Sequence, residues 1–564
     1  MAFDDILLTL GEFGTYQKIT FALVFMFWFP AAANVLAVVF LAGSSDHWCQ
    51  VSEWNNADCT GLGLNESDCA FYKKYLSIPH SVADDDTIVY DQCHKYDVSQ
   101  VSFSDAMSYF AENTNQSGYH DIISCDQGFE HDRASSGLTI TQSFDLVCDR
   151  KYLINLSQSL FFVGVLIGCV TFGAIADRFG RKVTLILCNI IFVLFGIGAA
   201  FSPNYITFVV MRTIEAAACF GFALTSYVIG TEFVGPSKRA FVSVMLTAVF
   251  PLGYILLTFY AYLINNWRHL LLALHLTFAL YFFFYPFIPE SVRWQISKGR
   301  YKEAQATVKR VAKINKVKLT DDFFYQHNFH KKRETTNPER NHDPNLIDLF
   351  RTPVLRKRMI VLIIVWMTNN LIFYGFHLST GSFGVDIYLS FVISGVVEIV
   401  SVVLCIPLIE WFGRRYSFIA SFVIAGVASF IVIFVPAGAA KTSIAMVGKF
   451  GIAASWAICG IYVIEILPTP TRSVGVGICS MASRIVAIAT PLLLLLYDVW
   501  APGPFVLQTI AALVAAGLCF ILPETRGKKL PETLEDGETF GIKSTEEIQS
   551  MDKLHLTQRG GVSA

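Results

Sequence analysis

Two charged residues, Glu398 and Arg484, each lie inside a long run of apolar residues. A charge at the centre of a membrane-spanning helix costs roughly 3 kcal/mol, so a residue of this kind is a functional candidate by default. A carboxylate there can hold an ammonium group, and a guanidinium can hold a carboxylate through paired hydrogen bonds. The combination favours a binding site for carnitine-like zwitterions. The alternative is that Glu398 and Arg484 neutralise each other as a structural ion pair.

Aromatic side chains accompany these two charges. Trp366, Phe373 and Tyr374 share one apolar run, and ring faces can hold a quaternary ammonium by cation–π attraction. His377, one turn beyond Phe373, can titrate near neutral pH, although a buried histidine with satisfied hydrogen bonds is the simpler interpretation. Because 14% of the chain is aromatic, any single ring is more often a packing residue. Weaker candidates from other runs are Tyr227, Phe250, Tyr254 and Trp456.

The apolar runs that carry these residues predict an all-α membrane protein. The chain of 564 residues is 54% hydrophobic and only 16% charged, whereas soluble domains carry roughly 25% charged residues. Each run is close to the roughly 20 residues that a helix needs to cross a bilayer. The first is too long for the core of a cleavable signal peptide, so we interpret it as a span. Twelve spans are expected, near 19–42, 152–174, 183–201, 205–231, 241–264, 269–288, 359–380, 384–409, 416–436, 442–467, 474–498 and 503–522.

Basic residues are distributed unevenly between the segments that connect the spans. The segment 290–358 carries 17 Lys and Arg, whereas the longer segment 43–151 carries six. By the positive-inside rule, 1–18, 289–358 and 523–564 are expected in the cytoplasm, and 43–151 outside the cell. Spans 2–6 then occupy 152–288 and spans 7–12 occupy 359–522. Within the linker, the apolar residues of 301–316 predict an amphipathic helix at the inner membrane surface, the alternative being a solvated helix.

The segment 43–151 has the composition of an extracellular domain. It holds six of the thirteen cysteines, an even set that predicts three disulfides, with fifteen pairings open. Asn65 and Asn115 lie in glycosylation sequons. The remaining seven cysteines lie in apolar runs and are expected to be inert core thiols. The six expected to pair are Cys49, Cys59, Cys69, Cys93, Cys125 and Cys148.

Charged residues at the ends of the spans repeat at a fixed distance along the chain. Asp177 and Glu410 are separated by 233 positions, as are Glu232 and Glu465, and Arg239 and Arg472. The sequence therefore predicts two pseudo-symmetric halves of six spans, related as parallel repeats. In each half, an acid and several bases can pair across neighbouring helix ends. Such pairs can hold the halves together when the cytoplasmic face is closed and break when it opens. The alternative is that they anchor helix ends against lipid headgroups. The residues expected to form this gate are Asp177, Arg178, Arg181, Glu232, Arg239, Glu410, Arg414, Glu465 and Arg472.

The loop GAIADRFGRK at 173–182 resembles the G-x-x-x-D-R-x-G-R-K motif of the major facilitator superfamily. The cysteine-rich segment and the strings SFDLVCD, GTEFVGPSKR, PESVRW, DLFRTPVLRKR and PETRGKKLPET resemble the organic cation, organic anion and carnitine transporters of solute carrier family 22. The likeness covers nearly the whole chain. It implies the major facilitator fold and transport by alternating access.

The resemblance also bears on individual site residues. The position of Arg484 is aspartate in typical cation transporters of the family and arginine in its anion and carnitine members. Glu398 matches the acid of the family, and Trp366 and Phe373 match positions that line its cavity. Cation transporters carry a lysine and a tryptophan where this chain has Phe220 and Ala223, which argues against a simple cation transporter.

We therefore expect a polyspecific organic ion transporter of the plasma membrane that favours carnitine-like zwitterions. Alternatives are an organic cation or anion carrier without zwitterion preference, and a non-transporting receptor that uses the segment 43–151. The sequence shows no ATP-binding loop, nucleophile elbow or metal-ligand cluster, so neither an enzyme nor a cofactor is expected. No nucleic-acid partner is indicated. Coupling to Na⁺ or to the membrane potential stays open, as does the oligomeric state.

Overall fold

The computed structural model describes residues 3–43, 45–55, 57, 59, 64–82, 87–112, 121–132, 137–235, 238–319, 346–528 and 530–541. Within these ranges, the side chains of 3–5, 111–112, 239–241, 243–244, 246–247 and 346–348 are not described. Ten helical segments of the described chain are long and apolar enough to span a membrane, and two shorter apolar helices occupy the expected places of spans 5 and 12.

The first six spans form the N-terminal half. Span 1 is broken, because Pro30 lies in the first turn of its second piece and cannot continue the preceding helix. Several helices begin at a side-chain cap, such as Asn204, which accepts a hydrogen bond from the amide of Thr207. The spans are α2 (Thr15–Met26) with α3 (Phe29–Leu41), α7 (Tyr152–Phe179), α8 (Arg181–Ala200), α9 (Tyr205–Glu232), α10 (Arg239–Leu263), and α11 (Trp267–Ala279) with η4 (Leu280–Phe287), after a short α1 (Phe3–Leu10).

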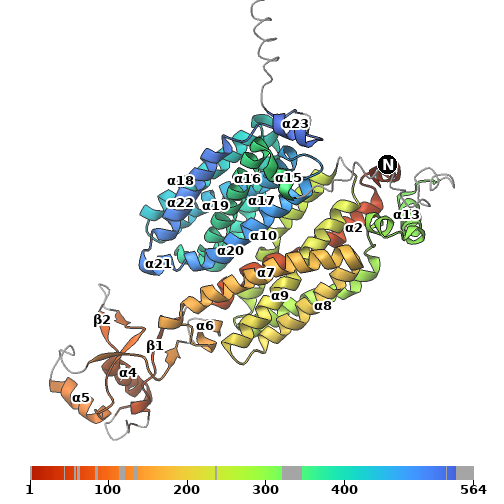
Figure 1. Cartoon of the computed structure of the whole chain (residues 1–564). Coiled ribbons are helices and arrows are strands. Elements are labelled where there is room, and N and C mark those ends of the chain that lie inside the picture. The colour runs from red at the N-terminus through yellow and green to blue at the C-terminus, as the bar shows by residue number, and fades with distance from the viewer. Residues whose placement is uncertain are drawn as a thin grey trace, which may run out of the picture.

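The last six spans form the C-terminal half, which occupies its own side of the bundle (Figure 1). Contacts between the halves are concentrated where α7 packs on α20 and α10 packs on α17. The surface along these two contacts is called the seam below. The spans are α16 (Pro353–Leu378), α17 (Ile387–Phe412), α18 (Arg414–Phe434), α19 (Ala439–Ile466), α20 (Arg472–Leu493) with α21 (Leu496–Val499), and α22 (Gly503–Cys519), with a short η6 (Thr380–Ser382).

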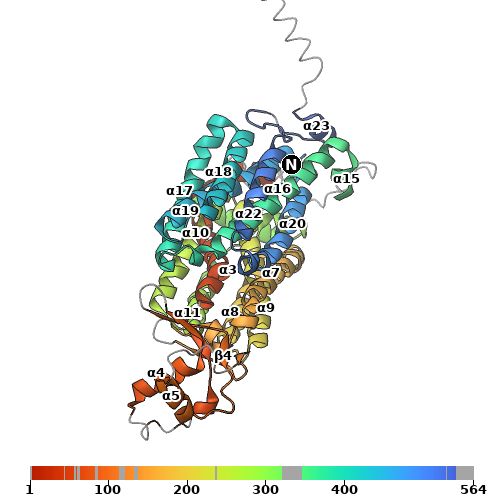
Figure 2. The same ribbon diagram turned by 90° about the vertical axis from the view of Figure 1, so that its left-hand side faces the viewer.

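Most of the described residues of 43–151 form a small unit, the loop domain, at one end of the bundle (Figures 1 and 2). The last part of the segment, with Ile140 and Leu146, packs into the core of the bundle. Its core contains Trp54, Val98 and Phe103 but few other buried apolar side chains. Disulfides join Cys49 to Cys125, Cys59 to Cys69 and Cys93 to Cys148, which compensates for the small core. The glycosylation candidate Asn65 is exposed at the start of α4, whereas Asn115 lies outside the described residues.

The loop domain also contains short strands that the sequence did not predict. Three antiparallel pairs form, β1 with β6, β2 with β3, and β4 with β5. The elements are β1 (His47–Cys49), η1 (Ser52–Trp54), α4 (Glu66–Ser77), β2 (His80–Val82), β3 (Ile88–Tyr90), β4 (His94–Tyr96), α5 (Phe103–Glu112), β5 (Ile122–Ser124), β6 (Phe129–His131), α6 (Ile140–Ser143) and η2 (Cys148–Arg150).

The linker helices lie at the opposite end of the bundle, the linker end, together with α1 (Figure 1). They are α12 (Val292–Ser297), α13 (Tyr301–Asn315) and α15 (Leu346–Arg351), and α23 (Leu534–Thr539) follows the last span. The apolar face of α13, formed by Ala304, Val308, Val311 and Ala312, is buried against α12, α2 and α1. The expectation that this face rests on the membrane is therefore wrong, because protein already covers it.

Candidate functional site

Aromatic rings from three helices meet near the middle of the bundle. Phe373 lies 5.7 Å from Phe250 and 6.1 Å from Trp456 between ring centroids, and Trp456 lies 5.8 Å from Trp366. The rings come from α10, α16 and α19, so this aromatic cluster joins the two halves. Trp456 is only partly buried, which leaves one face of the cluster accessible. Such faces can hold a quaternary ammonium.

Glu398 is buried beside this cluster and contacts a histidine. Its Oε1 lies 2.6 Å from Nε2 of His377 on the neighbouring helix α16. The imidazole packs 4.3 Å from the ring of Phe373 and 5.5 Å from that of Tyr254, centroid to centroid. Glu398 therefore places a negative charge at one end of the aromatic cluster.

Arg484 stands at the other end of the cluster and on another helix, α20. Its guanidinium carbon lies 5.6 Å from the ring centroid of Phe220 in the N-terminal half, and Tyr374 and Cys169 are further neighbours. Both Arg484 and Glu398 are described, and no ion pair joins them. The alternative of a mutually neutralising pair is wrong for this structure, because each charge has other neighbours.

Tyr227 does not join the aromatic cluster. Its described ring contact is with Trp28 of the N-terminal half, 6.3 Å away between centroids. Tyr374, by contrast, packs 5.4 Å from Phe373 and 4.7 Å from Phe162 of α7, so it bridges the seam. The geometry thus groups seven of the eight binding candidates, and Tyr227 lies apart.

The repeated charges at the linker end form ion pairs within each half. Arg181 Nη2 lies 3.1 Å from Asp177 and 3.5 Å from Glu232, and Arg414 Nε lies 3.2 Å from Glu465. The pairs of Arg181 with Glu232 and of Arg414 with Glu465 join the start of the third helix of a half to the end of the fourth. These contacts follow the expected pairing of an acid with a base across neighbouring helix ends within each half, and their gating role stays a prediction.

The other gate candidates lie around these pairs. Arg178 is exposed and packs on the ring of Phe179, and Glu410 is exposed with no ion pair to any described residue. Arg472 donates from Nε to the carbonyl of Leu467, 3.4 Å away. The side chain of Arg239 lies outside the described ones.

In each half, a further glutamate lies beside the ion pairs at the linker end. Glu290, after span 6, accepts a hydrogen bond from the amide of Arg181 at 2.9 Å, and Glu524, after span 12, accepts one from Arg414 at 2.9 Å. Each carboxylate caps the free amides that begin the third helix of its half. Burial raises the pKa of Glu290, while these donors and Arg181 stabilise its ionised form.

The halves are joined on the side of the loop domain. Lys151 Nζ lies 2.7 Å from Asp498 Oδ1, and the hydroxyls of Tyr254 and Ser394 lie 3.4 Å apart. The arrangement is therefore closed toward the loop domain.

Breaking the Lys151–Asp498 pair should loosen this closed side. An exposed ion pair contributes about 0.2–1 kcal/mol, so Asp498→Lys should favour opening by up to about fivefold. Opening is measured as the rate at which a membrane-impermeant thiol reagent labels a cysteine in place of Tyr388, which packs on Tyr262 across the seam. The double variant Lys151→Asp with Asp498→Lys is the control and should restore slow labelling. Equal rates in all variants would exclude a role for this pair.

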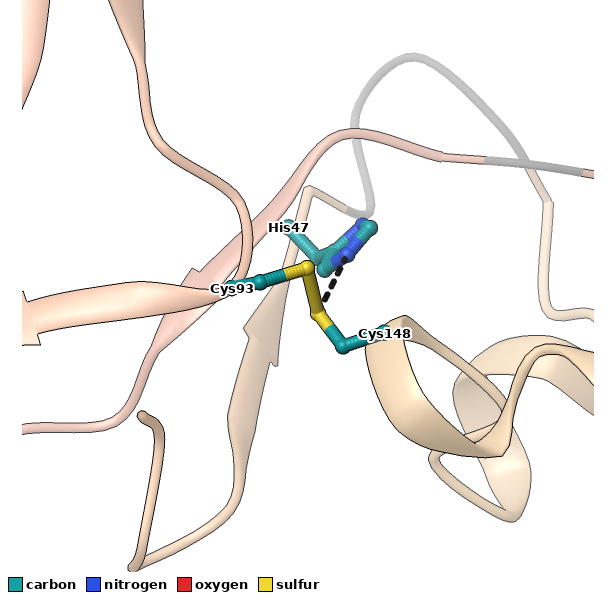
Figure 3. A group of neighbouring side chains, drawn as sticks. All are labelled: His47, Cys93 and Cys148. Atoms are coloured by element: carbon teal, nitrogen blue, oxygen red, sulfur yellow. Dashed lines mark hydrogen bonds between the residues drawn. A yellow bond between two sulfur atoms is a disulfide. The ribbon is translucent and has the colours of Figure 1, made fainter. Parts of the chain in front are cut away.

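One further cluster has the composition of a metal site. The ligand atoms of His47, Cys93 and Cys148 lie within 4.8 Å of one another. However, the two sulfurs form a disulfide, and Nε2 of His47 lies 3.8 Å from Sγ of Cys148 (Figure 3). Metal binding needs thiolates, so this cluster has a structural role in the loop domain.

Comparison with known proteins identifies the family. The family described as "Sugar (and other) transporter" matches residues 96–536. The "Organic cation transporter-like protein" of Drosophila melanogaster is 31% identical, and the match covers 97% of this chain and 94% of that protein. "Solute carrier family 22 member 13" of Homo sapiens is 33% identical over 95% of this chain and 93% of its own length. The chain belongs to solute carrier family 22.

The solved structures show the fold of this family 22 protein. The inward open conformation of the xylose transporter XylE from E. coli gives a TM-score of 0.55 at 17% identity, and covers 71% of this chain and 93% of that chain. At this identity the likeness concerns the fold alone, which is that of the major facilitator superfamily. The chain is thus a multi-pass membrane protein of a transporter family.

Sequence reasoning missed one residue of the site of this family 22 member. Lys449 in α19 is fully buried, and its Nζ donates to the hydroxyls of Thr380 and Ser394, each at 2.8 Å. A lone lysine in an apolar run is the same signal that identified Glu398 and Arg484. Another buried group lies in the N-terminal half, where Arg212 pairs with Glu215 at 3.1 Å and His275 contacts the same carboxylate at 2.9 Å.

Proposed function

We propose that this protein carries small organic ions across the plasma membrane by alternating access and favours carnitine-like zwitterions. The observation that supports this most is the separation of Glu398 from Arg484 by a row of rings. From Glu398 the row runs through His377, Phe373 and Tyr374 to Arg484. A zwitterion can place its ammonium near Glu398 on the ring faces and its carboxylate on Arg484.

The second candidate is an organic cation carrier without zwitterion preference. The names of related proteins favour it, since "Organic cation transporter protein" of Drosophila melanogaster is 32% identical over 96% of this chain. In that case Glu398 and the aromatic cluster bind the cation, and Arg484 serves as a structural charge. The aromatic cluster fits both candidates, so only the role of Arg484 separates them.

We further propose that both termini and the linker are cytoplasmic and that the loop domain is extracellular. The 17 basic residues of 290–358, against six in 43–151, support this orientation. Three disulfides in the loop domain fit an oxidising compartment. With this orientation, the closed loop-domain side makes the structure an inward-facing state. The proposed driving force is an ion gradient or the membrane potential, without a cofactor.

Uptake measurements test the proposed substrate class. Cells that express the protein are given labelled carnitine, tetraethylammonium as a simple quaternary cation, or a dicarboxylate. We expect carnitine uptake to exceed uptake of the other two at equal concentration, because only carnitine satisfies both charges. Cells that express the doubly substituted Glu398→Gln, Arg484→Gln protein are the matched control. Strong tetraethylammonium uptake without carnitine uptake would establish the second candidate instead.

A further inference from the structure

A cavity lined by basic side chains lies at the linker end of the C-terminal half. It has a volume of about 440 Å³ and lies between the start of α16, the start of α18 and the segment 520–523 that follows α22. Of the described residues that line it, none is acidic and three are basic, namely Lys357, Arg358 and Arg415. A cavity of this size can hold a charged headgroup, and basic pockets between spans bind anionic ones.

The two arginines of this cavity are held in place by backbone carbonyls. Arg358 is buried and donates to the carbonyls of Gly537 and Phe540. Arg415 donates from Nη2 to the carbonyl of Phe520 at 2.6 Å, whereas its Nε is buried without a hydrogen-bond partner among the described residues. A buried donor without a partner is unfavourable. Arg415 therefore keeps a donor that an oxygen of a ligand can satisfy.

Two carboxylates lie against the residues that line the cavity, and both are bound to backbone amides at the start of a helix. Glu524 accepts a hydrogen bond from the amide of Arg415 at 3.1 Å, and Glu538 accepts one from the amide of Val354 at 2.9 Å. Three basic side chains against these two carboxylates leave an excess of one positive charge. A phosphate diester carries one negative charge, so it balances this excess.

Apolar side chains border the same cavity and are exposed at the end of the last span. Phe520 and Ile521 line the cavity and are 55% and 41% exposed. The guanidinium carbon of Arg415 lies 5.6 Å from the ring centroid of Phe520 and 5.8 Å from that of the exposed Tyr416. Aromatic rings beside a basic residue at the end of a span are typical of the headgroup level of a membrane. The ligand is therefore expected to carry acyl chains as well as a phosphate.

We propose that this cavity binds the headgroup of an anionic phospholipid from the leaflet at the linker end. The phosphate lies on Lys357 and Arg415, and an acyl chain lies along Phe520 and Ile521. The site is distinct from the proposed substrate site, and its test does not depend on transport. The bound lipid joins the start of span 7 to the start of span 9, so it stabilises the folded protein.

Lipid titration of the purified wild-type protein in detergent gives the first test. Phosphatidylglycerol has a net negative charge, phosphatidylcholine has the same phosphate but no net charge, and inorganic phosphate has no acyl chain. We expect phosphatidylglycerol to bind severalfold more tightly than phosphatidylcholine by native mass spectrometry, less so at high salt, and to raise the Tm by a few degrees. Equal binding of the two lipids would overturn the proposal. An equal rise in Tm with inorganic phosphate would overturn the assignment to a lipid.

The substitution Lys357→Gln tests the site itself, because it removes one positive charge from the lining of the cavity. The affinity for phosphatidylglycerol should fall by about fivefold. Arg356→Gln is the matched control, since Arg356 is the preceding residue and is equally exposed but does not line the cavity. Its affinity should stay near the wild-type value. Equal affinities of the two variants would show that lipid binds to the basic surface in general and would overturn the assignment.

Cross-linking of the wild-type protein locates the lipid without any substitution. Phosphatidylglycerol with a photoactivatable group on an acyl chain is added to the purified protein, and the labelled peptides are identified by mass spectrometry. The peptide that contains Phe520 and Ile521 should carry the label, and an excess of unlabelled phosphatidylglycerol should remove it. Label spread evenly over the lipid-facing helices, or none on this peptide, would overturn the proposal.

Discussion

Replacing Arg484 by aspartate should turn the carrier from zwitterions toward simple cations. Arg484→Asp removes the only cation beside Phe220 and Tyr374 among the described residues and puts an anion in its place. A hydrogen-bonded charged contact contributes about 1.5–3 kcal/mol, so the initial rate of carnitine uptake should fall by roughly 10- to 150-fold. Uptake of tetraethylammonium should rise in the same variant. Initial uptake rates at low concentration, corrected for surface expression, give the ratio of carnitine uptake to tetraethylammonium uptake in each variant.

Two further variants separate charge from shape at this position. Arg484→Lys keeps the charge but loses the paired hydrogen bonds, so carnitine uptake should be intermediate. Phe220→Lys combined with Arg484→Asp places an opposite pair across the seam, and this pair neutralises the new aspartate. The double variant should therefore lose part of the gain in cation uptake. If Arg484→Asp leaves the preference for carnitine over tetraethylammonium unchanged, Arg484 does not contact the substrate.

The sequence predicted the spans because hydropathy and length largely determine them. The observed helices differ from the predicted runs by a few residues at their ends. For example, α7 continues to Phe179, five residues beyond the predicted end at 174. Helical hydrogen bonds continue past the point where residues become polar, so hydropathy gives the extent of the apolar layer and underestimates the helix.

The pairing of side chains was far less predictable. Glu398 and Arg484 stood out as charges in apolar runs, but their neighbours His377, Phe220 and Lys449 come from other helices. Rotation and register of packed helices decide such contacts, and periodicity within one helix does not contain them. For the same reason the sequence left the pairing of six cysteines open.

The linker-end motifs illustrate the same limit for function. Their repeat correctly indicated two related halves and ion pairs within each half, whereas the sequence did not show whether these pairs act as a gate. In each half, the ion pair and the glutamate that caps the third helix, Glu290 or Glu524, hold neighbouring helix ends together. We call this arrangement the clamp of that half. A half held in this way moves as a rigid body, and the motion is left to the seam.

Gly180→Ala should lower both stability and uptake, because this glycine lies directly before Arg181, at the helix end that Glu290 caps. Its φ of 110° is a conformation that residues with a side chain rarely adopt, and forcing one there costs about 1–3 kcal/mol. An added Cβ would also lie 2.4 Å from Oε2 of Glu290, which would displace the carboxylate from the amides it caps at a further cost of about 1 kcal/mol. The purified variant should show a lower Tm, and uptake per molecule at the surface should fall by about tenfold or more.

Substitutions at two other glycines distinguish the effect of backbone strain from the effect of displacing the glutamate that caps the third helix. Gly413 has φ 87° and an added Cβ would lie 2.6 Å from Oε2 of Glu524, so Gly413→Ala should repeat the loss in the other half. Gly11 has φ 88° but nothing within 4 Å of an added Cβ, so Gly11→Ala carries the strain alone and should lose less. If all three variants lose stability and uptake equally, backbone strain explains the effect and the carboxylate caps contribute little. A larger loss at Gly180 and Gly413 than at Gly11 would show that transport needs each half to keep its third helix fixed to the segment that follows its sixth span.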